Sequence, residues 1–167
     1  MAQSTPRKSS FPPVVGPAVR VLICGSLPGD RSLAAAQYYA HPQNQFWRLM
    51  SAVVDRDLTA LAYPDRLAAL LEARVGLWDV VATAHRPGST DAALSEIAPN
   101  DIAALAATLP DLRAIAFNGG TALKHGLKQL GATRHATVAL PSSSPLHTIG
   151  FDAKLPSWME LRDHLRH

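Results

Sequence analysis

The chain has 167 residues, a length typical of one domain with a single core. It has no run of the roughly 18 apolar residues that a membrane span needs, and its single cysteine, Cys24, excludes a disulfide framework and a metal site built of several thiolates. The net charge of +3 permits a polyanionic partner without requiring one. We therefore expect a protein without a membrane partner, in a reducing compartment such as the cytoplasm.

The first 18 residues predict a mobile N-terminal tail. This segment places Arg7 and Lys8 among several prolines, and it lacks the uninterrupted apolar block of a secretory signal. We expect residues 19–167 to form a single domain.

Short apolar runs then alternate with helical patterns. The apolar runs predict strands that are buried on both faces, at residues 20–26, 76–84, 113–118 and 135–141. The segments between and after them predict helices, at residues 44–54, 63–75, 100–110, 119–131 and 156–167. This alternation favours an α/β fold, a three-layer α/β/α sandwich around a central, mainly parallel four-stranded sheet.

Polar loops follow the four predicted strands. In chain order they read GSLPGDRS, AHRPGSTD, NGGT and PSSSPLHT. Ligands of parallel α/β sheets bind at the carboxyl ends of the strands. We therefore expect these loops to converge on one rim of the sheet.

Each loop also has a purely structural interpretation. GSLPG lacks the Lys-Ser/Thr of a P-loop and the glycine spacing of a dinucleotide fingerprint, so a tight turn explains it equally well. Asn44 and Asn118 could simply cap the helices that follow them, and Tyr38 and Tyr39 could anchor the first loop to the core.

Three further side chains have the chemistry for acid–base catalysis, but no visible partner. These are Asp79, His85 and His147. Neither a Ser/His/Asp set nor a metal-ligand spacing can be assembled from the chain, so we expect no metal site and no cofactor.

Taken together, the loops resemble those of the uracil-DNA glycosylase superfamily, and most closely its hypoxanthine-DNA (deoxyinosine) glycosylase branch. The segments GSLPGDRSL…YYAHPQNQFW, WDVVATAHRPGSTD and PSSSPLHT stand in the order of that branch, across nearly the whole chain from Arg20 onward. The resemblance implies a monofunctional, monomeric DNA-repair glycosylase without a cofactor. Such an enzyme flips a deaminated base, hypoxanthine or uracil, out of DNA and hydrolyses its N-glycosidic bond, leaving an abasic site.

The resemblance also assigns roles within the loops. It implies that Tyr39 stacks on the extruded base and that Leu146 fills the gap left in the duplex. The implied base-binding residues are Gly25, Ser26, Leu27, Tyr39 and Asn118. The implied DNA-binding residues are Pro28, Gly29, Ser142, Ser143, Ser144, Pro145, Leu146 and His147.

Two positions depart from the better-known branches of the superfamily. Leu27 stands where those branches have an Asp or Asn that positions the attacking water, and Ser142 aligns with a residue that is often His. Asn44 is then the best remaining candidate for holding the water, and Asn118 for contacting the base edge.

The same two departures support an alternative, a DNA-lesion or nucleobase-binding protein that has lost hydrolysis. A flavodoxin-like binder of small molecules is a third hypothesis. The bulky tyrosines and the tryptophan of the first loop disfavour it, because they replace a small-residue phosphate nest.

Overall fold

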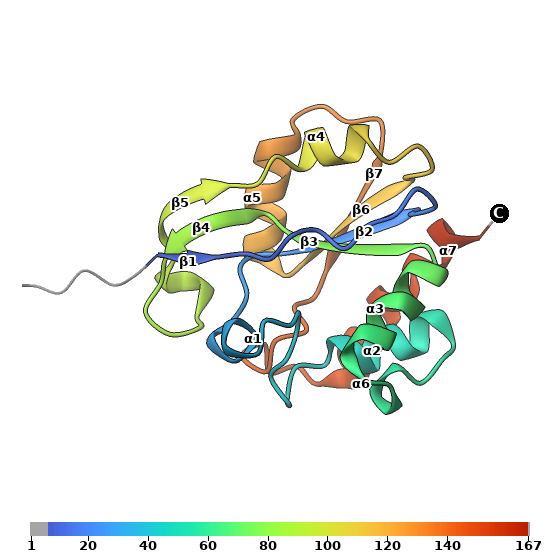
Figure 1. Ribbon diagram of the computed structural model, residues 1–167, viewed down its shortest axis with the longest axis horizontal. Coiled ribbons are helices and arrows are strands. Elements are labelled where there is room, and N and C mark those ends of the chain that lie inside the picture. The colour runs from blue at the N-terminus through green and yellow to red at the C-terminus, as the bar shows by residue number, and fades with distance from the viewer. Residues whose placement is uncertain (1–6, 167) are drawn as a thin grey trace, which may run out of the picture.

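The computed structural model describes residues 7–166 (Figure 1). Its central sheet has the strand order β3-β2-β6-β7, and all three pairings are parallel. The strands are β2 (Val21–Gly25), β3 (Val75–Asp79), β6 (Ala114–Asn118) and β7 (Ala136–Leu140). The predicted four-stranded parallel sheet is confirmed.

Helices cover both faces of this sheet (Figure 1). One face carries α2 (Phe46–Val54), α3 (Tyr63–Glu72), α6 (Phe151–Met159) and α7 (Leu161–Leu165), and the other carries α4 (Ile102–Ala107) and α5 (Gly120–Leu130). An apolar core lies on each face of the sheet. Along β2, Val21 and Ile23 belong to the first core, on the α2 side, and Leu22 and Cys24 belong to the second core, on the α5 side. Burial on both faces is the reason why the strand is a continuous apolar run.

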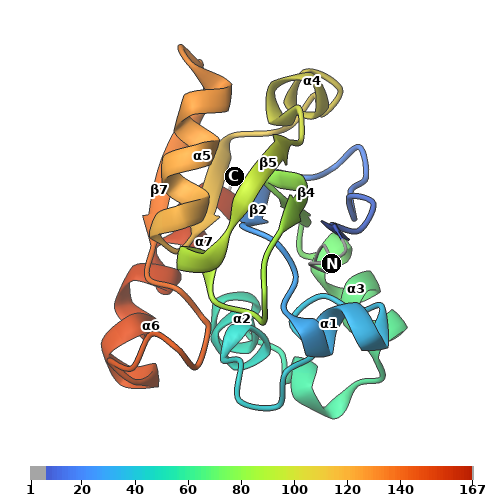
Figure 2. The same cartoon turned by 90° about the vertical axis from the view of Figure 1, so that its left-hand side faces the viewer.

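The second predicted strand, residues 76–84, is wrong as a single element. β3 ends at Asp79, and β4 (Val81–His85) turns away to pair antiparallel with β5 (Ser95–Pro99), at the end of the molecule that faces the viewer in Figure 2. The Val80 and Val81 N–H groups donate to the carbonyls of Gly25 and Ser26. Apolar residues stand on both sides of this junction, so the sequence gives no sign of the point at which the chain passes from one sheet to the other.

The prediction of a mobile tail over residues 1–18 does not hold for residues 7–18, which pair and pack with the rest of the domain. β1 (Lys8–Ser9) pairs antiparallel with β4, and Val14 forms a bridge with Leu77. The Phe11 ring meets Tyr38 edge-on, with 5.2 Å between ring centroids. Residues 1–6 lie outside the described residues.

The remaining elements differ from prediction mainly at their ends. A short helix, α1 (Asp30–Ala35), follows the first loop, and the 3-10 helices η1 (Leu58–Ala60) and η2 (Asp91–Ala93) lie in other connections. The last predicted helix, 156–167, begins earlier, because α6 accommodates Pro156 and α7 follows it. Within residues 7–166 no helix is long and apolar enough to span a membrane.

Candidate active site

A cleft of about 800 Å³ opens at the carboxyl ends of the parallel strands. The four polar loops converge on it, as expected, although AHRPGSTD reaches it from β4 and not from the parallel sheet. Every residue that was predicted for the site lines this cleft: Gly25, Ser26, Leu27, Pro28, Gly29, Tyr39, Asn44, Asn118, Ser142, Ser143, Ser144, Pro145, Leu146 and His147.

Arg86 holds the first loop in place. Its side chain is fully buried and donates hydrogen bonds to the carbonyls of Leu27 at 3.3 Å, Pro28 at 2.5 Å and Gly88 at 2.9 Å. These bonds join the turn after β2 to the hairpin between β4 and β5. The role of Arg86 could not be predicted, because nothing in the sequence distinguishes a buried arginine in a polar loop from a solvated one.

Asp91 reinforces this connection from the hairpin. It accepts a hydrogen bond from the Ser26 hydroxyl at 2.8 Å and lies 3.8 Å from the Arg86 guanidinium. Burial raises the pKa of Asp91, and the bond from Ser26 and the charge of Arg86 oppose that shift. Ser26 is therefore fixed within the turn by its own side chain.

Tyr39 presents a rigid aromatic surface to the cleft. Its ring stacks on the buried ring of Phe46, with 3.9 Å between centroids and 18° between planes. Its backbone has a φ of 55°, in the left-handed region that a tyrosine seldom adopts. The hydroxyl is buried without a hydrogen-bond partner among the described residues, and burial raises its pKa, so that the group stays neutral.

Asp79 ends β3 in the wall of the cleft. The residue is only 3% exposed, and Oδ2 has no hydrogen-bond partner within residues 7–166. Burial raises the pKa of Asp79 to about 7; the nearby charge of Asp91 adds to this shift and that of Arg86 opposes it. In the sequence Asp79 is a lone acid without a visible partner, whereas the fold brings it into the site.

The two asparagines both have structural partners in addition to lining the cleft. Asn44 Oδ1 accepts the Phe46 N–H at 2.9 Å, so the side chain also serves the start of α2. Asn118 donates to the Ser143 hydroxyl and accepts from the Ser143 N–H, both at 2.9 Å. The capping alternative thus describes part of what Asn44 does, whereas Asn118 holds the last loop.

That last loop, residues 141–147, is also supported from α6 and α2. Trp158 Nε1 donates to the Pro141 carbonyl at 3.0 Å, Lys154 Nζ to the Ser144 carbonyl at 3.2 Å, and the Gln45 N–H to the Ser143 carbonyl at 2.9 Å. Lys154 is fully buried, and burial lowers its pKa.

The outer part of the loop is open to solvent. Leu146 is 63% exposed, and His147 beside it is exposed as well. Ser143 is an exception to the predicted phosphate contacts, because its hydroxyl is turned inward onto Asn118. Ser142 and Ser144, the other two serines of the loop, are half-buried.

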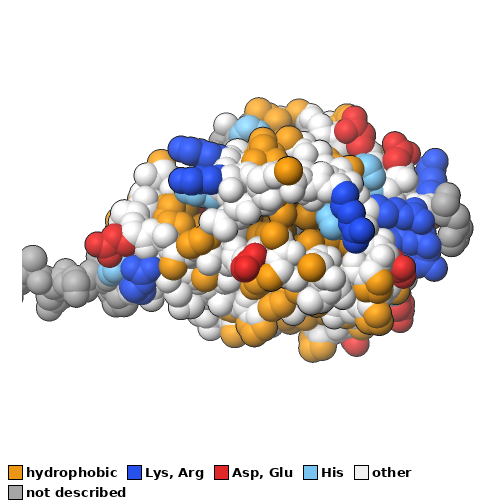
Figure 3. Space-filling model, turned by 90° about the horizontal axis from the view of Figure 1, so that it is seen from above, with side chains coloured by type: hydrophobic (Ala, Val, Ile, Leu, Met, Phe, Trp, Pro, Cys, Tyr) orange, Lys and Arg blue, Asp and Glu red, His pale blue; other side chains and the backbone are white. Residues whose placement is uncertain are grey.

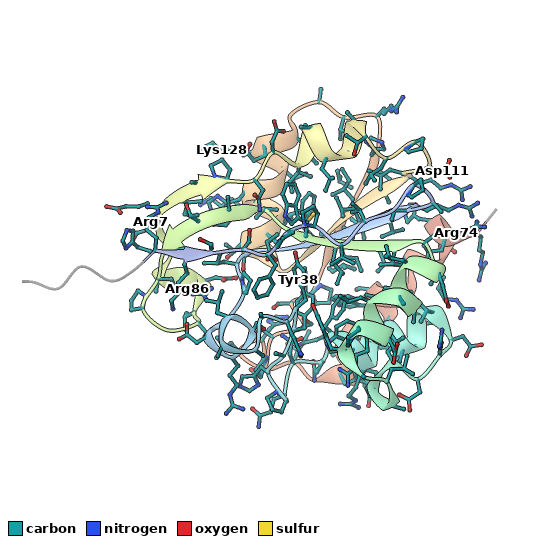
Figure 4. The ribbon with its side chains drawn as sticks, viewed as in Figure 1. Arg7, Tyr38, Arg74, Arg86, Asp111 and Lys128 are labelled. Carbon is teal, nitrogen blue, oxygen red and sulfur yellow. The ribbon has the colours of Figure 1, made fainter. Side chains whose placement is uncertain are left out.

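Positive charge gathers far from the cleft. Arg20, Arg74 and Arg113 precede three parallel strands, and desolvation, followed by the nearby charges of Arg113 and Arg74, lowers the pKa of Arg20. Figure 3 shows Lys and Arg side chains gathered at the end of the molecule where α7 lies, and Figure 4 shows Arg74 at the opposite end of the sheet from Arg86. The cleft itself includes Arg31 and Lys124.

Two other predicted features can be placed. His85 lies outside the cleft, where its Nε2 is 3.0 Å from Glu96. Cys24 is a buried free thiol. Within residues 7–166, no group of three or more His, Cys, Asp or Glu side chains could hold a metal ion.

Comparisons with known proteins agree with this geometry. The family model of the uracil DNA glycosylase superfamily matches residues 12–162. A hypoxanthine DNA glycosylase of Methanosarcina barkeri is 36% identical over 156 residues, which cover 92% of this chain and 97% of the relative. A hypoxanthine DNA glycosylase of Methanosarcina acetivorans is 40% identical over 139 residues, covering 82% and 86% respectively. The solution NMR structure of a candidate uracil DNA glycosylase from Methanosarcina acetivorans superposes with a TM-score of 0.84 at 36% identity, covering 96% of this chain and 99% of that chain.

The raised pKa of Asp79 predicts a stabilising substitution. The folded protein holds the Asp79 proton up to about pH 7, while the unfolded chain loses it near its usual value, so stability falls as the pH rises between these values. At pH 8, Asp79→Asn should raise the free energy of unfolding by about 2–4 kcal/mol, since each pKa unit corresponds to about 1.4 kcal/mol.

Urea unfolding between pH 4 and pH 8 measures this effect. The gain should grow across that range, while Asp65→Asn, which removes an exposed acid on α3, should change little. An equal gain at pH 4 and pH 8 would contradict the assigned cause.

Proposed function

Since the chain belongs to the uracil-DNA glycosylase superfamily and is a DNA glycosylase, we propose that it removes hypoxanthine or uracil from DNA. The observation that carries this proposal is the cleft, in which a rigid tyrosine, two asparagines and a buried carboxyl converge. Two relatives that are 36% and 40% identical over most of the chain are hypoxanthine DNA glycosylases.

In the proposed mechanism the base rotates out of the duplex and lies on the free face of the Tyr39 ring. Phe46 covers the other face, which keeps the platform fixed. Such stacking contributes about 1–3 kcal/mol per base. A deaminated base in a mispair is easier to extrude than a normally paired base, which favours lesions.

Hydrolysis then breaks the bond between C1′ and the base nitrogen. The base leaves with the bonding electrons and takes up a proton, and a water oxygen adds to the oxocarbenium-like C1′ while the water loses a proton. We assign the placement of this water to Asn44. An amide is a weak base, so its contribution is positioning and electrostatic stabilisation.

The Leu27 side chain has no polar group that could hold the attacking water, so another residue must do so. Leu27 is buried in the second core with Cys24 and Ala122, so this position of the turn serves packing. The alternative of a lesion-binding protein without hydrolysis rests on the same observation. We further propose that the enzyme is a monomer, acts in the cytoplasm and needs no cofactor.

A substrate panel distinguishes the two functions. Purified protein in EDTA should release hypoxanthine or uracil from duplexes that contain one such base, leaving alkali-labile abasic sites. The buffer contains EDTA because no metal-ligand group occurs in residues 7–166. Binding to all of these duplexes without cleavage would favour the binding protein, and activity that only a divalent metal restores would contradict the metal-free mechanism.

Asn44→Ala should lower the single-turnover rate by about 100-fold or more, the usual effect of losing one preorganised polar group. Lesion binding should change little. Asn44→Ser is the matched control, because serine is a good cap residue but does not reach as far. Equal losses in both variants would support the water-holding role, whereas normal activity in Asn44→Ser would leave Asn44 as a cap.

Leu146→Ala should weaken binding and cleavage of duplex DNA by about 10-fold or more, because the exposed leucine would no longer offset the unstacking cost. The effect should be much smaller on single-stranded substrate, which has no gap to fill. Leu127→Ala removes another exposed leucine, on α5 and outside the cleft lining, and should affect neither substrate. Equal defects of Leu146→Ala on both DNA forms would remove Leu146 from the proposed role.

A further inference from the structure

Asp79 is a buried acceptor that the protein leaves unsatisfied. Its residue is 3% exposed, Oδ2 has no hydrogen-bond partner, and no ion pair within residues 7–166 involves it. Buried carboxyl groups are almost always paired, because an unpaired one is costly. Because Asp79 also lines the cleft, a donor on a bound ligand is a group that could pair with its carboxyl.

Because Gly25 has no side chain, it leaves space beside the Asp79 carboxyl. A Cβ at Gly25 would lie 2.7 Å from Asp79 Oδ1, which is a clash, and 3.1 Å from the Tyr39 hydroxyl, which is a tight contact. The carboxyl and the hydroxyl end of the Tyr39 ring therefore meet at one point. Both residues line the cleft, so a base stacked on that ring would present its edge toward Asp79.

We propose that Asp79 reads the Watson–Crick edge of the extruded base by accepting a hydrogen bond from its ring N–H. This inference rests on the proposed function and names the group that selects the substrate class. Deamination converts N1 of adenine and N3 of cytosine from acceptors into the N–H donors of hypoxanthine and uracil. An ionised carboxylate can only accept, so it pairs with the deaminated base and repels the lone pair of its parent.

Guanine and thymine also carry this ring N–H. Asp79 therefore separates deaminated bases from adenine and cytosine, while normal pairing keeps guanine and thymine in the duplex.

Asn118 is less suited to this selection. Its amide oxygen and nitrogen each have one hydrogen bond to Ser143, which positions the last loop and leaves one N–H and one lone pair of the amide for other partners. An amide that did turn toward the base could offer either a donor or an acceptor, and would accept both the lesion and its parent.

The protonation state of Asp79 decides whether it can accept. The titratable or charged groups around it are Asp91 and Arg86 from the β4–β5 hairpin, Cys24 from β2, and Tyr38 and Tyr39 from the loop before α2. With a pKa of about 7, Asp79 is ionised above neutral pH and protonated below it. Excision of hypoxanthine should therefore increase as the pH rises from 6 to 8.

The test compares single-turnover excision of hypoxanthine and N1-methylhypoxanthine, which lacks the N–H, from single-stranded DNA. The wild type should prefer hypoxanthine by about 100-fold or more, since a site built around one hydrogen bond rejects an analogue that lacks it. Asp79→Ala should reduce this preference below about 10-fold because hypoxanthine excision becomes slower. Relief of crowding alone would instead leave the hypoxanthine rate unchanged and raise the methylated one, and would overturn the proposal.

The pH profile gives an independent result. In Asp79→Asn the rise between pH 6 and pH 8 should disappear, and thermal unfolding establishes that the variant is folded. Asp91→Asn is the matched control. It removes a neighbouring negative charge, so the rise should persist but move to lower pH. A wild-type rate that increases as the pH falls would make Asp79 a proton donor and would overturn its proposed role in reading the base. A wild type that releases no hypoxanthine at any pH would instead contradict the proposed function itself.

Discussion

The site depends on one buried cation, the guanidinium of Arg86. By bonding the carbonyls of Leu27 and Pro28, it holds the turn after β2 against the β4–β5 hairpin, to which Arg86 belongs. The hairpin itself exists because the chain leaves the parallel sheet directly after Asp79. One ionic group thus fixes the wall of the cleft and also supplies the positive charge that moderates the pKa of the nearby acid. An arginine suits this position because its planar group donates to several carbonyls at once and stays charged when buried.

The opposite wall is stabilised differently, mainly by neutral hydrogen bonds and aromatic packing. Asn118 and Trp158 hold the backbone of the last loop through neutral hydrogen bonds, and Lys154 adds one charged donor, so that Leu146 can extend into solvent without loosening the loop. Phe46 does the same for Tyr39 by covering one face of its ring. Between these rigid walls, Asp79 and Tyr39 keep polar atoms that are unsatisfied in the free protein. Their burial costs stability, and a bound base would recover part of that cost.

Much of the fold could be predicted, because burial on both faces leaves a direct record in the sequence. β2 and β6 are buried throughout and are continuous apolar runs, whereas β7 is mostly exposed at the sheet edge, and glycine stands directly before α1, α5 and α6. β3 and β4 could not be separated, since the turn between them requires no special residue and is made by backbone bonds to Gly25 and Ser26. The prediction of a mobile tail was wrong for residues 7–18 for a similar reason. Their order comes from pairing with β4 and from the contact of Phe11 with Tyr38, which are both distant in the sequence.

The sequence by itself determined the α/β architecture, the family and the loops that line the cleft, because periodicity and local motifs carry that information along the chain. Only the tertiary structure decided what the individual side chains do. Arg86 was an ordinary loop arginine until the fold buried it, and Asp79 was a lone acid until β2 and the hairpin closed around it. Asn118, a candidate for contacting the base, also holds Ser143. Burial, charge proximity and the absence of a partner are properties of contacts between distant segments, so no pattern within one segment can reveal them.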